Sequence, residues 1–433
     1  MTVTQQSVPR RPAPREGARD FRLFATGDLV SQLGSQVTLF ALPLLAVTVL
    51  SSSGAGVGLL QACYTVPFFV LPLFAGVWVE RRARRPIMIG LDAGRAALVL
   101  SIPVAAALDV LSLPLLCVAA LAGGAMTVGY DVAAAAYLPR LVAPAALDRA
   151  NSRILANQAV GATTGPALAG WMASLIGLAA TLLADFASYL VAMTMLLLIR
   201  RREPAAAGPA AVDAAGPAAV DAPQRRNLRR ELSEGLRAVL GNPPVRAVAL
   251  HAAVYNAGIE LITVAFLIHF VHDLGYGGAA YGVVLTLGGV GAIIGALTAP
   301  ALIARVGYGR ALLTALVFST TVYFVLPAAG GSVLTATALC GAAFLIGCAG
   351  AAAGGVVAVT VRQRTTAPEL HARMTATYRL IALGAVPIAA AVAGVLADTI
   401  GARATLWLAP IVLLLSVLPA TVAPLRRLRQ LPD

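Results

Sequence analysis

Long apolar stretches of the chain alternate with short polar segments that carry nearly all of the charge. The apolar stretches lack the strict alternation of a β-strand, and a helix of about 20 residues is enough to cross the hydrocarbon core of a bilayer. Twelve such stretches occur, at residues 22–50, 55–79, 87–108, 113–137, 153–176, 178–199, 247–271, 279–304, 311–329, 333–361, 375–397 and 404–424. We therefore predict an all-α integral membrane protein with twelve transmembrane helices.

The longest polar connection divides these helices into two groups of six. It contains AAGPAAVDAAGPAAVDA, a repeat of small residues, proline and aspartate that cannot bury a core. The stretch ELSEGLRAVLGNPPVR that follows is predicted to form an amphipathic helix on the membrane surface, ended by Pro243 and Pro244. The predicted parts are a tail at 1–20, a six-helix bundle at 21–199, a linker with a surface helix at 200–244, a second bundle at 245–425 and a tail at 426–433.

The two halves share local patterns at a nearly constant separation. Arg81 and Arg85 recur as Arg305 and Arg310, and Pro166 in GPALAG recurs as Pro387 in GAVPIAAAVAG. A parallel repeat of two bundles with a pathway at their interface is typical of many secondary transporters. We predict two pseudo-symmetric six-helix bundles.

Composition and charge agree with a membrane protein. Hydrophobic residues make up 59% of the 433 residues and charged residues only 12%, about half the usual share of a soluble domain. The net charge of +13 comes from 32 basic residues, all arginine, and these lie in alternate connections, with only Arg403 on the other side. Membrane topology explains this pattern better than binding to nucleic acid, and it predicts that both termini face the cytoplasm.

Several kinds of chemistry find no support in the sequence. The four cysteines lie inside apolar runs, and the chain contains no HExxH, no GxSxG and no lysine for a nucleotide-binding P-loop. His269 and His272, at the outer end of the seventh predicted helix, have no evident third metal ligand and are interpreted as interfacial residues. We therefore expect neither an enzyme nor a bound metal or cofactor.

The connection between the second and third predicted helices, within AGVWVERRARRPIMIG, concentrates charge. It holds a glycine, an acid four residues later and a group of basic residues, namely Gly76, Glu80, Arg81, Arg84 and Arg85. This arrangement resembles the cytoplasmic loop signature of the major facilitator superfamily, in particular the twelve-span bacterial exporters of drugs and siderophores. The resemblance in layout covers residues 20–425, with Ala83 in place of one loop glycine and Glu in place of the commoner Asp.

In that family the loop latches the two halves together on the cytoplasmic side. The resemblance implies that Glu80 faces the start of the eleventh helix, near Arg373 or Arg379, and that Arg84 pairs with Asp148. The alternative is that the arginines only anchor the topology. The second-half copy, PALIARVGYGR, has Ala304 where the acid would be, so an asymmetric latch is expected.

A second family pattern lies in the fifth predicted helix. Gly161, Gly165, Pro166 and Gly170 resemble the antiporter signature of the superfamily, which goes with export. Small residues at this spacing let helices approach closely, and proline removes a backbone hydrogen bond. Generic small-residue packing is the alternative. The fourth helix lacks the arginine that many proton-coupled drug antiporters carry there, which puts the usual proton relay in doubt.

Charged residues inside the predicted helices are costly unless each has a partner, a watery cavity or a function. Asp28, Gln32 and Gln36 recur every fourth residue and form one polar stripe on the first helix, which must face the bundle interior or a cavity. Asp92 and Arg95 are three residues apart and are interpreted as a structural ion pair.

Glu260 lies deepest of the acids. It follows Arg246 by 14 residues, which is about 21 Å along a helix, and Asn256 precedes it by one turn on the same face. Burial favours the neutral form of a carboxyl group, so Glu260 is a candidate for proton coupling or substrate binding. The alternative is a structural carboxyl partnered by Arg379, Asn256 or a tyrosine. Asp131 and Asp185 are weaker candidates for the same role.

Together these observations predict a proton-driven exporter of an amphipathic small molecule, cationic or neutral, in the bacterial cytoplasmic membrane. We expect a monomer whose two halves alternate in access, with a small-molecule substrate, protons and the lipid bilayer as its partners. An importer of a nutrient with the same fold is the first alternative. A transport-inactive sensor or scaffold is a further one.

Overall fold

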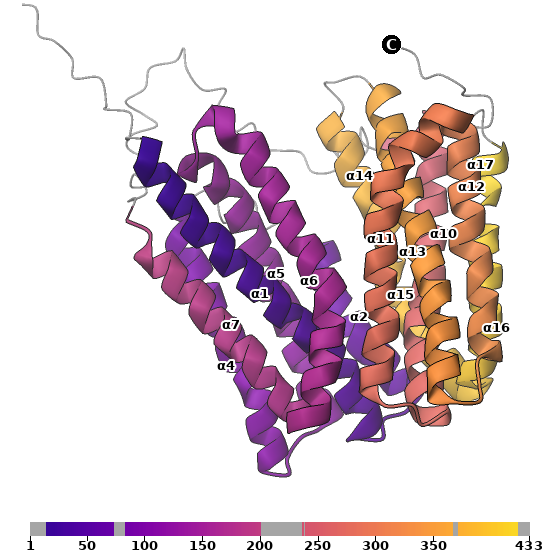
Figure 1. Ribbon diagram of the computed structural model, residues 1–433, viewed down its shortest axis with the longest axis horizontal. Helices are drawn as coiled ribbons and strands as arrows, with labels where there is room; N and C mark the ends of the chain where they lie inside the picture. Colours follow the sequence, from indigo (N-terminus) through magenta and orange to yellow (C-terminus); the bar gives the residue numbers. More distant parts are fainter. Residues whose placement is uncertain (1–13, 73–82, 201–235, 238, 367–370, 423–433) are drawn as a thin grey trace, which may run out of the picture.

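The computed structural model describes residues 14–72, 83–200, 236–237, 239–366 and 371–422. In these ranges every regular element is a helix, and the helices form two bundles (Figure 1). Nine helical segments are long and apolar enough to cross a membrane, and α2 and α16 are shorter apolar helices. The prediction of an all-α membrane fold of two six-helix bundles is confirmed.

The N-terminal bundle follows the chain in order, with one helix for each predicted span. Its helices are α1 (Pro14–Thr48), α2 (Gly54–Val70), α4 (Arg84–Ala107), α5 (Leu113–Leu141), α6 (Leu147–Ile176) and α7 (Leu178–Leu198). A 3₁₀ turn, η1 (Pro144–Ala146), joins α5 to α6. α6 has 30 residues but is not among the apolar spans, because glycine, threonine, proline and polar residues lower its mean hydropathy.

The C-terminal bundle repeats this order with more interruptions. Its elements are α10 (Pro243–Leu267) continued by the π-helix η2 (Ile268–Asp273), α11 (Gly278–Val306), α12 (Tyr308–Thr321) continued by η3 (Val322–Ala328), α13 (Val333–Arg364), α14 (His371–Gly384) with α15 (Val386–Thr399), and α16 (Ala402–Leu415) with α17 (Leu418–Val422). Each continuation or pair completes one span, so this bundle also has six.

Prolines act differently at related positions of the two halves. Pro387 is in the first turn of α15 and follows the break after Gly384, whereas Pro166 lies inside the continuous α6. Pro243 and Pro244, which we expected to end the surface helix, form the first turn of α10. Proline suits a first turn because the N–H that it lacks has no partner there in any case.

The bundles meet through two pairs of helices, α6 with α11 and α2 with α15. We call the end where α7 finishes and α10 starts the linker end, and the opposite end the distal end. Figure 1 shows the bundles close together at the distal end and diverging toward the linker end. An apolar core joins them, since the ring centroids of Phe40 in α1 and Tyr281 in α11 are 5.6 Å apart.

Glycines bring α11 and α13 into backbone contact inside the C-terminal bundle. A Cβ atom added at Gly291 would lie 2.7 Å from the carbonyl carbon of Leu345 and 2.8 Å from its Cα. Gly295 meets the backbone of Ala349 in the same way, one turn further on. Any larger side chain at these positions pushes the two helices apart.

We expect Gly291→Leu to lower the stability of the C-terminal bundle by about 1–3 kcal/mol, the usual cost of overpacking. The measurement is the midpoint of thermal unfolding in detergent, followed by the fluorescence of the three tryptophans. Gly355→Leu in α13 is the matched control, because a Cβ atom there meets nothing within 4 Å. Equal midpoints for the two variants would contradict the packing described here.

Candidate functional site

A polar cavity of about 200 Å³ lies within the N-terminal bundle. Its wall is formed by α1, α2, α4, α5, α6 and α7, and it mixes acidic, amide, hydroxyl and aromatic side chains. The polar and aromatic residues of the wall are Asp28, Ser31, Gln32, Ser35, Gln36, Thr38, Tyr64, Phe68, Arg95, Thr127, Tyr130, Asp131, Gln158 and Tyr189. Leucines, alanines, Val99, Ile102 and Gly123 complete the wall and give it an apolar component.

The polar stripe of α1 faces this cavity. Asp28, Gln32 and Gln36 all line it, as the one-turn spacing along the helix requires. Asp28 is only 5% exposed, and its Oδ2 accepts a hydrogen bond of 2.8 Å from Nδ2 of Asn157 in α6. The same amide donates to the carbonyl of Ala25 at 2.8 Å. Asn157 therefore ties the acid of α1 to α6 through a neutral donor.

Arg95 enters the cavity wall from α4. Its guanidinium is ion-paired with Asp92 one turn earlier and lies over two aromatic rings, 4.4 Å from the centroid of Tyr130 and 4.6 Å from that of Tyr189. Cation–π contacts of this kind are strongest where water is excluded, and Arg95 is only 4% exposed. The guanidinium thus holds α4, α5 and α7 together.

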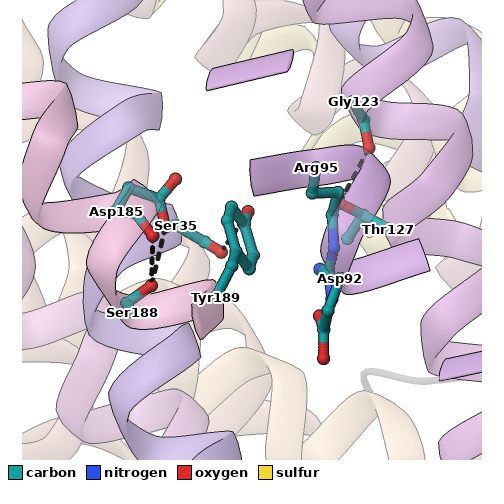
Figure 2. A network of polar contacts seen from close by, with 8 residues as sticks. All are labelled: Ser35, Asp92, Arg95, Gly123, Thr127, Asp185, Ser188 and Tyr189. Carbon is teal, nitrogen blue, oxygen red and sulfur yellow. Dashed lines mark hydrogen bonds and ion pairs between the residues drawn. The ribbon is translucent and has the colours of Figure 1, made fainter. Parts of the chain in front are cut away.

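Asp185 occupies a drier place beside the cavity (Figure 2). It is fully buried, and its carboxylate accepts hydrogen bonds from Thr38 of α1 and from Ser188 one turn later. The hydroxyl groups of Ser35 and Tyr189 are 3.0 Å apart. Figure 2 shows the ring of Tyr189 between Asp185 with its neighbouring serines on one side and Arg95 on the other. Asp185 is placed to join α7 to α1, and it is absent from the cavity wall.

Asp131 of α5 differs from the other acids of this bundle. Asp131 lines the cavity, and it is exposed although it lies deep within the helix bundle. It makes no hydrogen bond or ion pair with another residue in the part of the chain that the structure describes. Asp131 is therefore the acid of the wall most available to a bound molecule.

Glu260 lies apart from this cavity, in α10 of the C-terminal bundle. Its Oε2 is buried and has no hydrogen-bond partner within the described ranges. Asn256, one turn earlier, donates to the carbonyl of Ala382 in α14 at 2.7 Å. The structure brings neither of these two residues to the polar stripe of α1.

The residues expected to form a gate are only partly placed. Gly76, Glu80 and Arg81 lie outside the described residues, as does the side chain of Arg373. Arg84 is buried at the start of α4, while Asp148 and Arg379 are exposed on α6 and α14.

Arg85 has a defined role within its own bundle. It donates to the carbonyl oxygens of Leu196 at 2.8 Å and Leu197 at 2.9 Å, at the end of α7. The last carbonyl groups of a helix have no partner in the helix and favour a cation, so Arg85 caps α7.

The glycines of the predicted antiporter pattern lie at two helix contacts. Gly161 and Gly165 pack against Gln32 and Gln36 of α1, and Gly170 packs against the backbone of Gly278 and Ala279 in α11. α6 therefore contacts the polar stripe on one side and the other half of the molecule on the other.

Sequence reasoning missed part of the cavity. Tyr64, Tyr189, Ser31 and Ser35 face it without an acid or a motif to mark them, and Arg95 was assigned to a structural pair alone. For α1 a signal was available, because Ser31 and Ser35 precede Gln32 and Gln36 by one residue and widen the polar face. Tyrosines in apolar runs carry no such signal. The described residues also contain no group of three or more His, Cys, Asp or Glu that could hold a metal ion.

Two six-helix bundles, one of which encloses a polar cavity, are typical of a polytopic membrane transport protein. The profile of the Major Facilitator Superfamily matches residues 24–382, and the chain belongs to this superfamily. No curated protein matches the sequence significantly. The superfamily predicted from the loop signature is therefore confirmed. The match is to the superfamily as a whole and not to its exporter branch.

Solved structures of transporters share the fold at low sequence identity. A bacterial homologue of the iron transporter ferroportin in its inward-facing state has a TM-score of 0.71 at 16% identity, covering 93% of this chain and 98% of that chain. A nucleoside transporter has a TM-score of 0.70 at 15% identity, with coverage of 93% and 97%. A bacterial homologue of the human lysosomal transporter Spinster has a TM-score of 0.66 at 15% identity, with coverage of 98% and 100%.

The ferroportin homologue also provides a comparison between states. Its outward-facing structure has a TM-score of 0.56 with this chain at 17% identity and the same coverage, against 0.71 for the inward-facing structure. The helices of the present chain thus superpose more closely on that inward-facing structure than on the outward-facing one.

We expect Asn157→Leu to destabilise the N-terminal bundle, because it removes the hydrogen bond from α6 to the carboxyl group of Asp28. Loss of a hydrogen bond to a charged group costs roughly 1.5–3 kcal/mol. The midpoint of chemical unfolding in detergent measures this change. Gln158→Leu, at the next position and exposed in the cavity wall, serves as control. A midpoint that moves as little for the first variant as for the second would argue against the Asp28–Asn157 contact.

Proposed function

We propose that the chain exports an amphipathic small molecule, cationic or neutral, across the bacterial cytoplasmic membrane in exchange for protons. Drugs, secondary metabolites and siderophores are the substrate types that the loop resemblance suggests. The observation that carries the proposal is the cavity of the N-terminal bundle, where two carboxyl groups stand beside aromatic and apolar surface.

The charge of the wall favours a cation. Asp28 and Asp131 are its two acids, and its one base, Arg95, is ion-paired with Asp92 behind it. The wall therefore carries an excess of negative charge when both acids are ionised. Tyr64 and Phe68, whose ring centroids are 5.3 Å apart, supply aromatic faces that attract organic cations.

The same carboxyl groups suit exchange with protons. Neither Asp28 nor Asp131 forms an ion pair with an arginine among the described residues, so each carboxylate can bind either a proton or a cation. A cation that binds at the carboxylates displaces their protons, and a proton that binds displaces the cation. Opposed binding at one site is sufficient to couple the two movements.

The orientation follows from the arginines. They gather at the linker end, which the positive-inside rule assigns to the cytoplasm. The bundles diverge toward that end, and the helices superpose better on an inward-facing relative (Figure 1). These findings support a cavity that loads from the cytoplasm and empties at the distal end after the halves rock.

Glu260 remains a second candidate for proton coupling. Its buried Oε2 lacks a partner among the residues described, and an unpaired carboxylate in such a place is costly unless it is protonated. Its position in the other bundle separates it from the cavity acids, so its proton uptake in this role is independent of theirs.

We expect Asp28→Asn and Asp131→Asn each to reduce proton-driven transport at least about tenfold, because each removes a group that binds both proton and cation. Inverted membrane vesicles are supplied with a panel of organic cations, neutral metabolites and siderophores, and accumulation is followed under an imposed pH gradient. Asp109→Asn is the matched control, an exposed acid in the loop between α4 and α5.

Three results would overturn parts of this proposal. Normal transport by the Asp28→Asn, Asp131→Asn double variant removes the assigned site. Accumulation that persists after the gradient is collapsed excludes proton coupling. Substrate movement only toward the cytoplasmic face identifies an importer instead.

A further inference from the structure

The first turn of α2 is held by a carboxylate from the other half of the molecule. Asp398, near the end of α15, accepts hydrogen bonds from the backbone N–H of Gly54 at 2.5 Å through Oδ1 and of Ala55 at 2.8 Å through Oδ2. α2 begins and α15 ends at the distal end. The contact therefore joins the two bundles on the side opposite the linker.

These bonds complete the cap of α2. The first four N–H groups of a helix have no acceptor within the helix, and its N-terminus carries partial positive charge. Among the first three residues of α2, Ser53 accepts from the N–H of Gly56 at 3.2 Å through its Oγ. Asp398 accepts from the N–H groups of the other two, Gly54 and Ala55. Two of these three N–H groups are thus capped from across the interface.

Close backbone packing holds the carboxylate in position. A Cβ atom added at Gly54 would lie 2.7 Å from the carbonyl oxygen of Gly394, and one added at Gly58 would lie 3.0 Å from the Cα of Gly394. Because α2 and α15 touch through glycine, Asp398 reaches the helix end without a long side chain. This seam exists only while the distal ends of the bundles are together.

An apolar core inside the seam excludes water from the same end. Phe40 of α1 packs against Tyr281, and Tyr281 packs against Phe266 at 5.7 Å and Phe270 at 6.4 Å between ring centroids. All four rings are buried. Apolar packing favours a closed distal end but does not fix the relative position of the helices. The Asp398 contact does fix it, because the carboxylate must reach the N-terminus of α2.

We propose that Asp398 and the first turn of α2 form a distal latch, which is closed in the inward-open state and must break before the distal end opens. When the distal end opens, the N–H groups of Gly54 and Ala55 and the carboxylate of Asp398 lose these bonds and form hydrogen bonds with water. Asp398 therefore sets part of the balance between inward-open and outward-open molecules. The proposal depends on alternating access, as in the proposed function, but on none of the cavity residues.

The test uses the full chain in lipid nanodiscs without any substrate. Hydrogen–deuterium exchange followed by mass spectrometry reports the N–H groups of residues 54–57 directly. We expect Asp398→Ala to accelerate their exchange roughly three- to tenfold, because the interaction of a carboxylate with a helix N-terminus is lost. Asp398→Asn, which keeps the shape and removes the charge, should have a smaller effect in the same direction.

A distance measurement separates a latch from a local cap. Spin labels at positions 49 and 400, both exposed at the distal end on different bundles, report the separation of the bundles by electron–electron double resonance. The four native cysteines are first replaced by serine. We expect Asp398→Ala to increase the population with long distances, and we expect Asp109→Asn, which removes an exposed distal acid in the loop after α4, to leave it unchanged.

Gly394→Leu supplies an independent variant, because its side chain forces α2 and α15 apart and should shift the distances in the same way. Faster exchange in Asp398→Ala with an unchanged distance distribution would show a cap without a latch, and would overturn the proposal. So would unchanged exchange at residues 54–57. Neither readout involves transport. If the Asp28 and Asp131 variants transport normally in the vesicle assay, the proposed function fails but the test of the latch is unaffected.

Discussion

A charged or strongly polar group within the bilayer must find a partner inside the protein, and this requirement organises the N-terminal bundle. Water is absent from the hydrocarbon core, so an unpaired charge there costs several kcal/mol (roughly 2.5–3.5 on insertion scales). Asp28 bonds to Asn157, Asp185 to Thr38 and Ser188, and Arg95 to Asp92 and two tyrosines. These contacts join α1 to α6, α1 to α7, and α4 to α5 and α7. The groups that are costly in isolation are the ones that position the helices.

The cavity forms where polar groups outnumber the partners that the helices supply. Gln32, Gln36 and Asp131 face this space, and Asp131 is an exposed residue of its wall. The surrounding bonds keep the wall in place while the space itself stays available to water or to a bound molecule. A rigid polar frame around an open interior is what a binding site for a charged ligand requires.

The two halves share a scaffold but divide the chemistry. The N-terminal bundle contains the polar network, whereas the C-terminal bundle is held by glycine contacts between α11 and α13 and by a cluster of aromatic rings. The interface between the halves uses small residues again, at α6 with α11 and at α2 with α15. Such surfaces lack interlocking side chains, so two bundles can tilt against each other without unpacking their cores. Directional contacts such as the one made by Asp398 then decide which end is closed.

The sequence alone determined the class, the twelve spans, the repeat and the family, because each depends on local properties such as the length of an apolar run, the side on which arginines lie and the spacing of residues in one loop. The polar stripe of α1 was equally readable, since one turn of a helix returns every fourth residue to the same face. Only the tertiary structure decided which acids share a space. Asp28 of α1 and Asp131 of α5 line the same cavity, Asp185 is hydrogen-bonded to its neighbours, and Glu260 lies in the other bundle. These outcomes depend on how helices far apart in the chain rotate and approach one another, and polar contacts between helices together with close glycine contacts set that geometry.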